Sequence, residues 1–238
     1  MGNLSEFLME ELNVATAFTI PIFGGIEVAE STVISWVIMA IIVILTLVLT
    51  RNMRVEKPGK LQVGVEYTVT ALQNLVRGII GHEGERYVPY LSTVLVFLGI
   101  SNIFAIFGMK PPTKDLNVTA ALALMSIILV QAASIRQNKV GGWLKGFTKP
   151  SKVITPLNVM ELAIRPLSLC MRLFGNVMGA FVVMKLLEHL VPVILPAVFS
   201  LYFDFFDGLL QAYVFVFLTG LYIKEAVEAV SYTHLTLP

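Results

Sequence analysis

Apolar runs of about twenty residues or more constrain this chain more than any other feature of its sequence. Five such runs cover residues 31–49, 89–107, 117–135, 156–190 and 195–227. A helix of about 20 residues crosses the ~30 Å hydrocarbon core of a bilayer, where backbone groups must satisfy their hydrogen bonds internally. The runs lack the alternating pattern of barrel strands. The sequence therefore predicts an all-α polytopic membrane protein with about five membrane helices.

The last two runs predict a long helical hairpin. Pro192 and Pro196 interrupt helical continuity at its turn, because proline lacks the backbone N–H that a helix interior needs. Residues 62–80 mix apolar and polar side chains and predict an amphipathic helix at the membrane interface. We expect one integral membrane domain over residues 1–230. Residues 231–238 fit no span, and we expect a non-native or disordered tail there.

Basic side chains predict the orientation in the membrane. They gather at residues 51–60, after the first run, and at residues 136–152, after the third run, where no acid accompanies them. Cytoplasmic loops carry an excess of lysine and arginine, so we expect both loops in the cytoplasm and the N-terminus outside. Five spans then return the C-terminus to the cytoplasm.

Composition excludes several classes of function. Only 14% of the residues are charged and the mean hydropathy is +0.81, whereas about a quarter of a soluble domain is charged. A formal net charge of +1 points to no nucleic-acid partner. The single cysteine, Cys170, allows no internal disulfide, and acids such as Glu6 and Glu10 stand where a signal peptide needs basic residues. Without a Walker A, HExxH or GxSxG pattern, we expect no cofactor, no metal site and no catalytic chemistry in this chain alone.

An arginine stands inside the fourth run, where the bilayer should exclude it. Successive residues of an α-helix are rotated by about 100° around its axis, so Arg172 shares one side of the helix with several other polar residues. We call this set the stripe. The stripe contains Glu161, Arg165, Ser168, Arg172, Asn176 and Gly179. Arginine at the bilayer centre costs ~2.5–3.5 kcal/mol on insertion scales, and its guanidinium cannot escape by losing a proton. The charge therefore needs a carboxylate partner or a water-filled cavity.

Two further polar clusters open or continue neighbouring runs. The last run carries a polar side with the i, i+3, i+4, i+7 spacing of one helix face; its members are Asp204, Asp207, Gly208 and Gln211. The third run opens with Asp115, Asn117 and Thr119. These groups predict the lining of a polar pathway. Two alternatives stay open, since the amides and Thr119 can simply tie helices together and Asp115 can be a helix N-cap.

Three strings in these runs carry a family resemblance. They are RPLSLCMRLFGN at residues 165–176, LQAYVFVFLT at residues 210–219 and DLNVTAALAL at residues 115–124. In this order and spacing they closely resemble subunit a of the F-type ATP synthase, from about residue 31 to residue 228. The resemblance implies a long, tilted hairpin packed on the ring of c subunits. It also implies b subunits, which connect the chain to the catalytic sector, and a bacterial plasma membrane.

The resemblance also implies a mechanism. Two offset aqueous half-channels lead a proton or a sodium ion to and from the ring, and Arg172 stands between them, facing the ring carboxylate. Asn176 and Gln211 lie beside the arginine, and Glu161 is the candidate for the exit path toward the cytoplasm. The outer half-channel is lined by Asp204 and Asp207 together with the cluster Asp115, Asn117 and Thr119.

One position departs from the family pattern. Many members carry an acid nine residues after the arginine, which interacts with a histidine or acid on the last helix. Phe181 occupies that position here, and Asp204 stands at the second one. We therefore expect an outer path rebuilt around Asp204 and Asp207, with the coupled ion left open.

A self-contained secondary transporter for a small anionic substrate is the alternative function. Transporters of that kind often carry inverted repeats around a site at the membrane midplane. The chain shows no such repeat, and the polar side of its hairpin is one-sided, as if another protein completed it. These two features favour the ATP synthase subunit.

Overall fold

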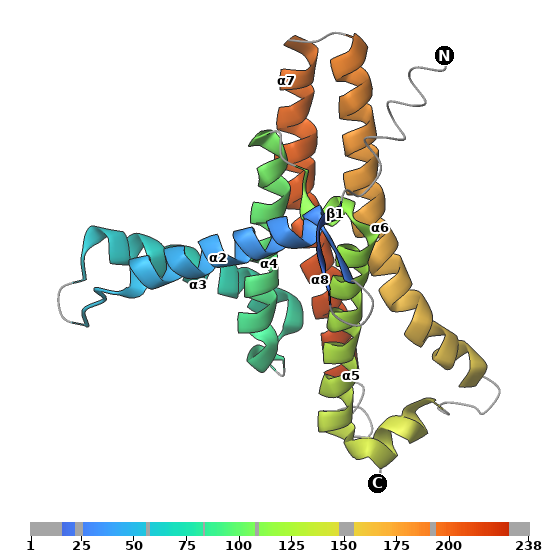
Figure 1. Cartoon of the computed structure of the whole chain (residues 1–238). Helices are drawn as coiled ribbons and strands as arrows, with labels where there is room; N and C mark the ends of the chain where they lie inside the picture. Colours follow the sequence, from blue (N-terminus) through green and yellow to red (C-terminus); the bar gives the residue numbers. More distant parts are fainter. Residues whose placement is uncertain are drawn as a thin grey trace. The chain divides into compact units, whose positions relative to one another are not determined.

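A computed structural model describes the chain over most of its length. The described residues are 16–21, 26–55, 58–82, 84–107, 110–147, 155–190 and 194–228. Pro192, the acids near the N-terminus and the tail at 231–238 lie outside them. The described part is helical apart from an antiparallel strand pair, β1 (Thr16–Ile20) and β2 (Ile26–Ala29), that the sequence analysis did not predict (Figure 1). The all-α class is confirmed.

The first half of the chain follows the apolar and amphipathic runs closely. Helix α2 (Glu30–Thr50) is the first predicted span, and α3 (Lys60–Ile80) is the amphipathic helix. Helix α3 ends at Gly81, whose φ of 77° suits glycine at a helix C-terminus. After the single turn η1 (Glu85–Tyr87), α4 (Val88–Ile103) runs into the 3-10 turn η2 (Phe104–Phe107).

The second half contains the longest helices. A 3-10 turn, η3 (Pro112–Lys114), leads into α5 (Leu116–Phe147), which breaks at Lys139 with φ 56° and ψ 162°. The hairpin begins with α6 (Thr155–Leu190), 36 residues long with Pro166 inside it. Its return arm consists of α7 (Ile194–Ser200), the π-helical segment η5 (Leu201–Asp207) and α8 (Gly208–Glu228).

Four helical stretches of the described chain are long and apolar enough to cross a membrane. They are Glu30–Thr50, Leu116–Gln137, Thr155–His189 and Val198–Val227. The second predicted span is the exception, because the α-helix there has 16 residues, or about 24 Å at ~1.5 Å per residue, before it tightens into η2. The count is one lower than expected for this reason.

The chain divides into two compact units that both draw on several helices. The first unit consists of Met1–Asn52, Val96–Thr119 and Leu173–Ala212, and the second of Met53–Leu95, Ala120–Arg172 and Tyr213–Pro238. This division into compact units does not test whether residues 1–230 form one membrane domain, which stays a prediction.

The two units have different interiors. The second unit buries an apolar core in which Ile80, Leu91, Leu169, Phe215 and Ile223 are almost fully enclosed. The first unit also encloses apolar side chains, but most of the buried polar groups of the described chain belong to it. They include Ser101, Asn102, Thr113, Lys114, Asp115, Thr119 and Gln211. Buried polar groups need partners, so the first unit has the interior that suits a polar pathway.

Candidate functional site

A cavity of about 400 Å³ lies inside the first unit. Its wall comes from α4, the C-terminal half of α6, α7, η5 and the start of α8; Figure 1 shows α7 beside that half of α6. The polar and charged residues of the wall are Asn102, Lys110, Lys185, Glu188, Ser200, Asp204, Asp207 and Gln211. A cavity with this lining can hold water and pass a small cation or a proton.

Both aspartates of the return arm face this cavity from η5. Asp204 accepts a hydrogen bond of 2.6 Å from the Ser200 hydroxyl, and both carboxylates are only partly enclosed. Gln211, one turn further along, lines the same cavity. The structure therefore brings together the three side chains that the sequence analysis placed on one helix side.

The two amides predicted beside the arginine contact each other directly. Asn176 on α6 donates a hydrogen bond of 2.6 Å to the side-chain oxygen of Gln211 on α8. Gln211 is 2% exposed, and its side-chain nitrogen has no partner among the described residues. A buried donor of this kind is usually satisfied by water or by another chain.

The Phe181 ring lies beside two positively charged groups, at the position where many members of the family are expected to have an acid. The Lys114 ammonium lies 3.5 Å from the centre of the Phe181 ring, and that of Lys185 lies 5.8 Å away. Lys185 also forms an ion pair of 2.9 Å with Glu188. An aromatic face attracts a cation through its quadrupole, so the ring holds an ammonium group at the edge of the cavity.

The cluster that opens α5 has another arrangement. Asp115 is buried, accepts a hydrogen bond from the Ser31 hydroxyl on α2, and receives the Asn117 backbone N–H at 2.9 Å. The Thr119 hydroxyl bonds the Leu116 carbonyl at 3.0 Å. Asp115 thus acts as the helix cap that was left open as an alternative. None of Asp115, Asn117 and Thr119 is among the residues lining the cavity.

Arg172 is exposed on α6. No described residue forms a hydrogen bond or an ion pair with it, although it belongs to a stretch that is apolar enough to span a membrane. Gly175 and Gly179, on the same helix side, have no atom of a described residue within 4 Å of where a Cβ would stand. The described part of the chain therefore leaves this side of α6 uncovered around the arginine.

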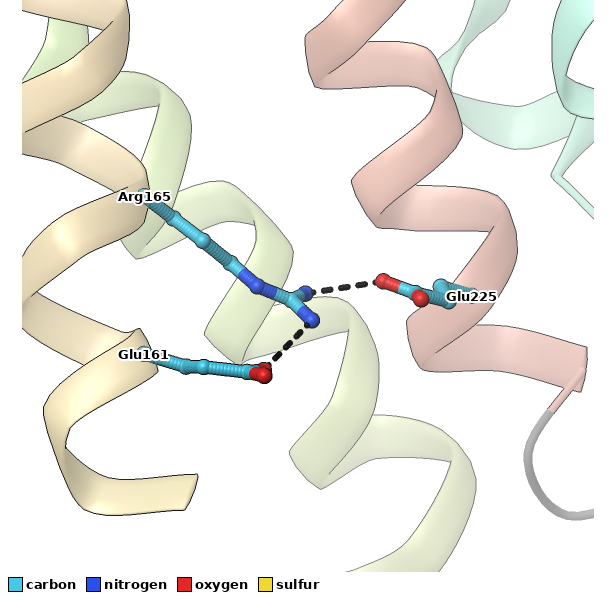
Figure 2. Close-up of polar contacts among 3 residues, drawn as sticks. All are labelled: Glu161, Arg165 and Glu225. Atoms are coloured by element: carbon cyan, nitrogen blue, oxygen red, sulfur yellow. Dashed lines mark hydrogen bonds and ion pairs between the residues drawn. The ribbon is translucent and has the colours of Figure 1, made fainter. Parts of the chain in front are cut away.

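A second polar cluster belongs to the second unit. Figure 2 shows Arg165 of α6 between two carboxylates, 3.1 Å from Glu161 and 3.0 Å from Glu225 of α8. The guanidinium also lies 4.9 Å from the centre of the Tyr222 ring. These residues, Tyr222 apart, line a cavity of about 290 Å³. Glu225 was missed by the sequence analysis, although its i+3 spacing from Tyr222 would have placed it on the same helix side.

Comparison with known proteins decides the family. The family model described as "ATP synthase A chain" matches residues 32–224. The chain is 37% identical over 206 residues to ATP synthase subunit a of Moorella thermoacetica, covering 86% of this chain and 94% of that protein. The chain belongs to the ATP synthase subunit a family. The resemblance carried by the three strings is confirmed.

Other members of the family give the same result. ATP synthase subunit a 1 of Hahella chejuensis is 33% identical and covers 90% of each chain. A sodium ion specific subunit a of Propionigenium modestum is 30% identical, covering 87% of this chain and 77% of that protein. The chain is therefore a multi-pass, ion-translocating stator subunit of an F-type ATP synthase, and its partners are the other subunits of that complex.

Proposed function

We propose that Arg172 is the fixed cation that faces the ionised carboxylate of a c subunit. The observation that carries this proposal is an exposed arginine in a membrane-spanning helix with no partner among the described residues. Its insertion cost of ~2.5–3.5 kcal/mol requires compensation. A carboxylate on a neighbouring c subunit supplies this compensation, because the two opposite charges attract each other as the ring turns.

An apolar seam beside the arginine supports a helical partner. Exposed large side chains recur along α6 with alternating spacings of three and four residues; they are Leu157, Met160, Ile164, Leu167 and Met171. This is the spacing of a helix that packs along another helix. Gly175 and Gly179 continue the side with room for close approach. A helix of the c ring fits this seam, and the neighbouring guanidinium meets its carboxylate.

We assign the cavity of the first unit to the outer half-channel. Asp204 and Asp207 collect the ion, and the pair of Gln211 and Asn176 leads it toward the arginine, four residues before Asn176 on α6. The ion neutralises a ring carboxylate, which then turns into the lipid without a charge. Arg172 favours the ionised form of the next carboxylate and repels a cation that would pass straight through.

The cavity around Glu161, Arg165 and Glu225 is our candidate for the exit. Two carboxylates against one guanidinium leave an excess of negative charge, which attracts a departing cation. From the basic loops we infer that this cluster lies toward the cytoplasm and the N-terminus outside, in a bacterial plasma membrane. We propose the proton as the coupled ion, and the c ring and b subunits as the direct partners.

Replacement of Arg172 tests the proposal. In the complete ATP synthase in inverted vesicles, Arg172→Ala should abolish ATP-driven proton pumping in sodium-free buffer, because no cation then meets the ring carboxylate. Assembly should persist, since no described residue depends on this side chain. Arg136→Ala, an exposed arginine near the end of the third span, is the matched control and should pump normally. Normal pumping by Arg172→Ala would contradict the proposal.

A further inference from the structure

One buried asparagine connects three segments around the cavity. Asn102 of α4 is 3% exposed and lines the cavity. Its side-chain nitrogen donates to the backbone carbonyl of Gly208 at 2.8 Å, and its oxygen accepts from the Thr113 hydroxyl at 2.9 Å. Thr113 is itself fully buried. The Gly208 carbonyl can only accept, so it requires the amide nitrogen on its side, and the Thr113 hydroxyl then donates to the amide oxygen on the other side.

Gly208 is the residue at which the return arm changes from π-helix to α-helix. Its N–H donates to the carbonyl of Phe203, five residues earlier, which is a π-helical bond. A Cβ on Gly208 would stand 2.8 Å from the Cβ of Asn102. A residue with a side chain therefore cannot bring this backbone so close to the asparagine.

The π-helical segment decides which way Asp204 points. A π turn contains about one residue more than an α turn, and one residue corresponds to about 100° of rotation. If η5 relaxed to α-helix while α8 stayed in place, Asp204 and Ser200 would rotate by about that angle. In the structure Asp204, Asp207 and Gln211 instead share one cavity, with η5 in the π form.

Such a segment needs support from outside the helix. π-helical turns are rare and occur mostly as single turns at functional sites. The bond from Asn102 is fixed at the C-terminal border of η5, and η2, the turn that follows α4, contacts η5 itself. Both supports come from the segment that precedes α5. The observations thus connect a buried amide to the direction of the Asp204 carboxylate, which it does not touch.

We propose that Asn102 is a positioning residue for ion transfer: supported by Thr113, it holds Gly208 and the π-helical segment so that Asp204 faces the cavity together with Asp207. The role in transfer rests on the proposed function, because it requires this cavity to be a half-channel. The geometric part does not, so the two are tested separately.

Thiol labelling in the assembled complex measures the geometry. In a Cys170→Ser background, which leaves no other cysteine in this chain, Asp204→Cys places a thiol on η5 at the position whose direction the π turn sets. A water-soluble thiol reagent should label it while Asn102 is present. Asn102→Leu should slow labelling about tenfold or more, the ratio that ~1.4 kcal/mol in favour of a turned-away state produces. Gly99→Ala, whose Cβ would stand 3.4 Å from the end of Leu209, is the control and should leave the rate unchanged.

A second pair of variants keeps the test decisive if Asn102→Leu fails to assemble. Thr113→Val keeps the shape of the side chain but removes the hydroxyl that donates to the amide oxygen of Asn102, whereas Thr113→Ser keeps the hydroxyl. We expect slow labelling in Thr113→Val and normal labelling in Thr113→Ser. Loss of packing alone would not be rescued by the shorter serine. Equal labelling in both variants, or unchanged labelling in assembled Asn102→Leu, would overturn the inference.

Proton pumping without the cysteine then tests the connection to transfer. Asn102→Leu and Thr113→Val should pump more slowly than Thr113→Ser, in the order of their labelling rates. If labelling falls but pumping does not, Asn102 positions Asp204 and the cavity is not the half-channel, which overturns its role in transfer. Pumping by Arg172→Ala would instead contradict the proposed function and leave the geometry of Asn102 untouched.

Discussion

Phe181 is the side chain that most clearly distinguishes this chain from the family pattern its sequence resembles. In place of an acid, the ring lies under the ammonium of Lys114 and near that of Lys185, at the wall of the cavity with Asp204. Lys114 is 8% exposed. A buried ammonium needs compensation, and a ring face gives about 0.5–2 kcal/mol of it.

Charge substitution at position 181 tests this environment. Phe181→Glu should assemble and retain pumping, because two ammonium groups are placed to pair with a new carboxylate. Phe181→Lys should assemble poorly, since a third ammonium there has no such partner and carries an insertion cost of ~2.5–3.5 kcal/mol. The amount of subunit in the purified complex and the pumping rate measure both. Equal assembly of the two variants would show that the local charge does not matter.

Asp115 shows how one residue can fit two predictions from the sequence. Its position before an apolar run suits both a pathway carboxylate and a helix cap, and the cap is what the structure contains. The structure adds a part-buried hydrogen bond from Ser31, 84 residues away in the sequence, and the pathway role stays a prediction. Local patterns cannot supply such a contact, because it depends on which helices pack together.

Helix packing in the second unit depends on a glycine of α8. Gly220 is buried, and a Cβ there would stand 2.9 Å from a side-chain methyl of Ile79 and 3.4 Å from Ile80, both on α3. Gly220→Ala should therefore force α3 and α8 apart and destabilise the protein by about 1–3 kcal/mol, the usual cost of overpacking. The loss of this subunit from the complex during a temperature ramp measures the effect.

A glycine on the facing helix provides the control for this prediction. Gly64 of α3 is exposed and has nothing within 4 Å of a Cβ position. Gly64→Ala should be neutral or stabilise the helix by up to about 1 kcal/mol, because alanine is the better helix former. If both substitutions lowered stability alike, the close contact at Gly220 would not be the cause.

Helices α2, α3 and α6 could be predicted within two residues at their ends, because backbone groups in lipid must satisfy their hydrogen bonds within a helix. The third run was expected to end at residue 135, but α5 continues to Phe147. Helix α2 was expected at 31–49 and lies at Glu30–Thr50, and α6 was expected at 156–190 and lies at Thr155–Leu190. The π-helical segment was not predicted, since its residues follow the same i, i+3, i+4 spacing as an α-helix. The strand pair precedes the first span and carries no apolar run of its own.

The site was only partly predictable from the sequence, because some of its residues belong to one helical arm and others come from distant segments of the chain. Sequence spacing brought Asp204, Asp207 and Gln211 together correctly, because all three belong to one continuous arm. It did not find Asn102 or Glu225, whose partners come from distant segments. The partner proposed for Arg172 belongs to another chain, so its role depends on the family and on experiment.

The most direct test of the central claim measures the proton leak through the complete ATP synthase without nucleotide. A fixed cation between two half-channels should keep them separate, so vesicles with the native complex or with Arg136→Ala should hold an imposed pH gradient. Arg172→Ala should let the gradient collapse faster and should not pump when ATP is added. A gradient held as tightly as in the native complex, together with ATP-driven pumping, would contradict the role of Arg172.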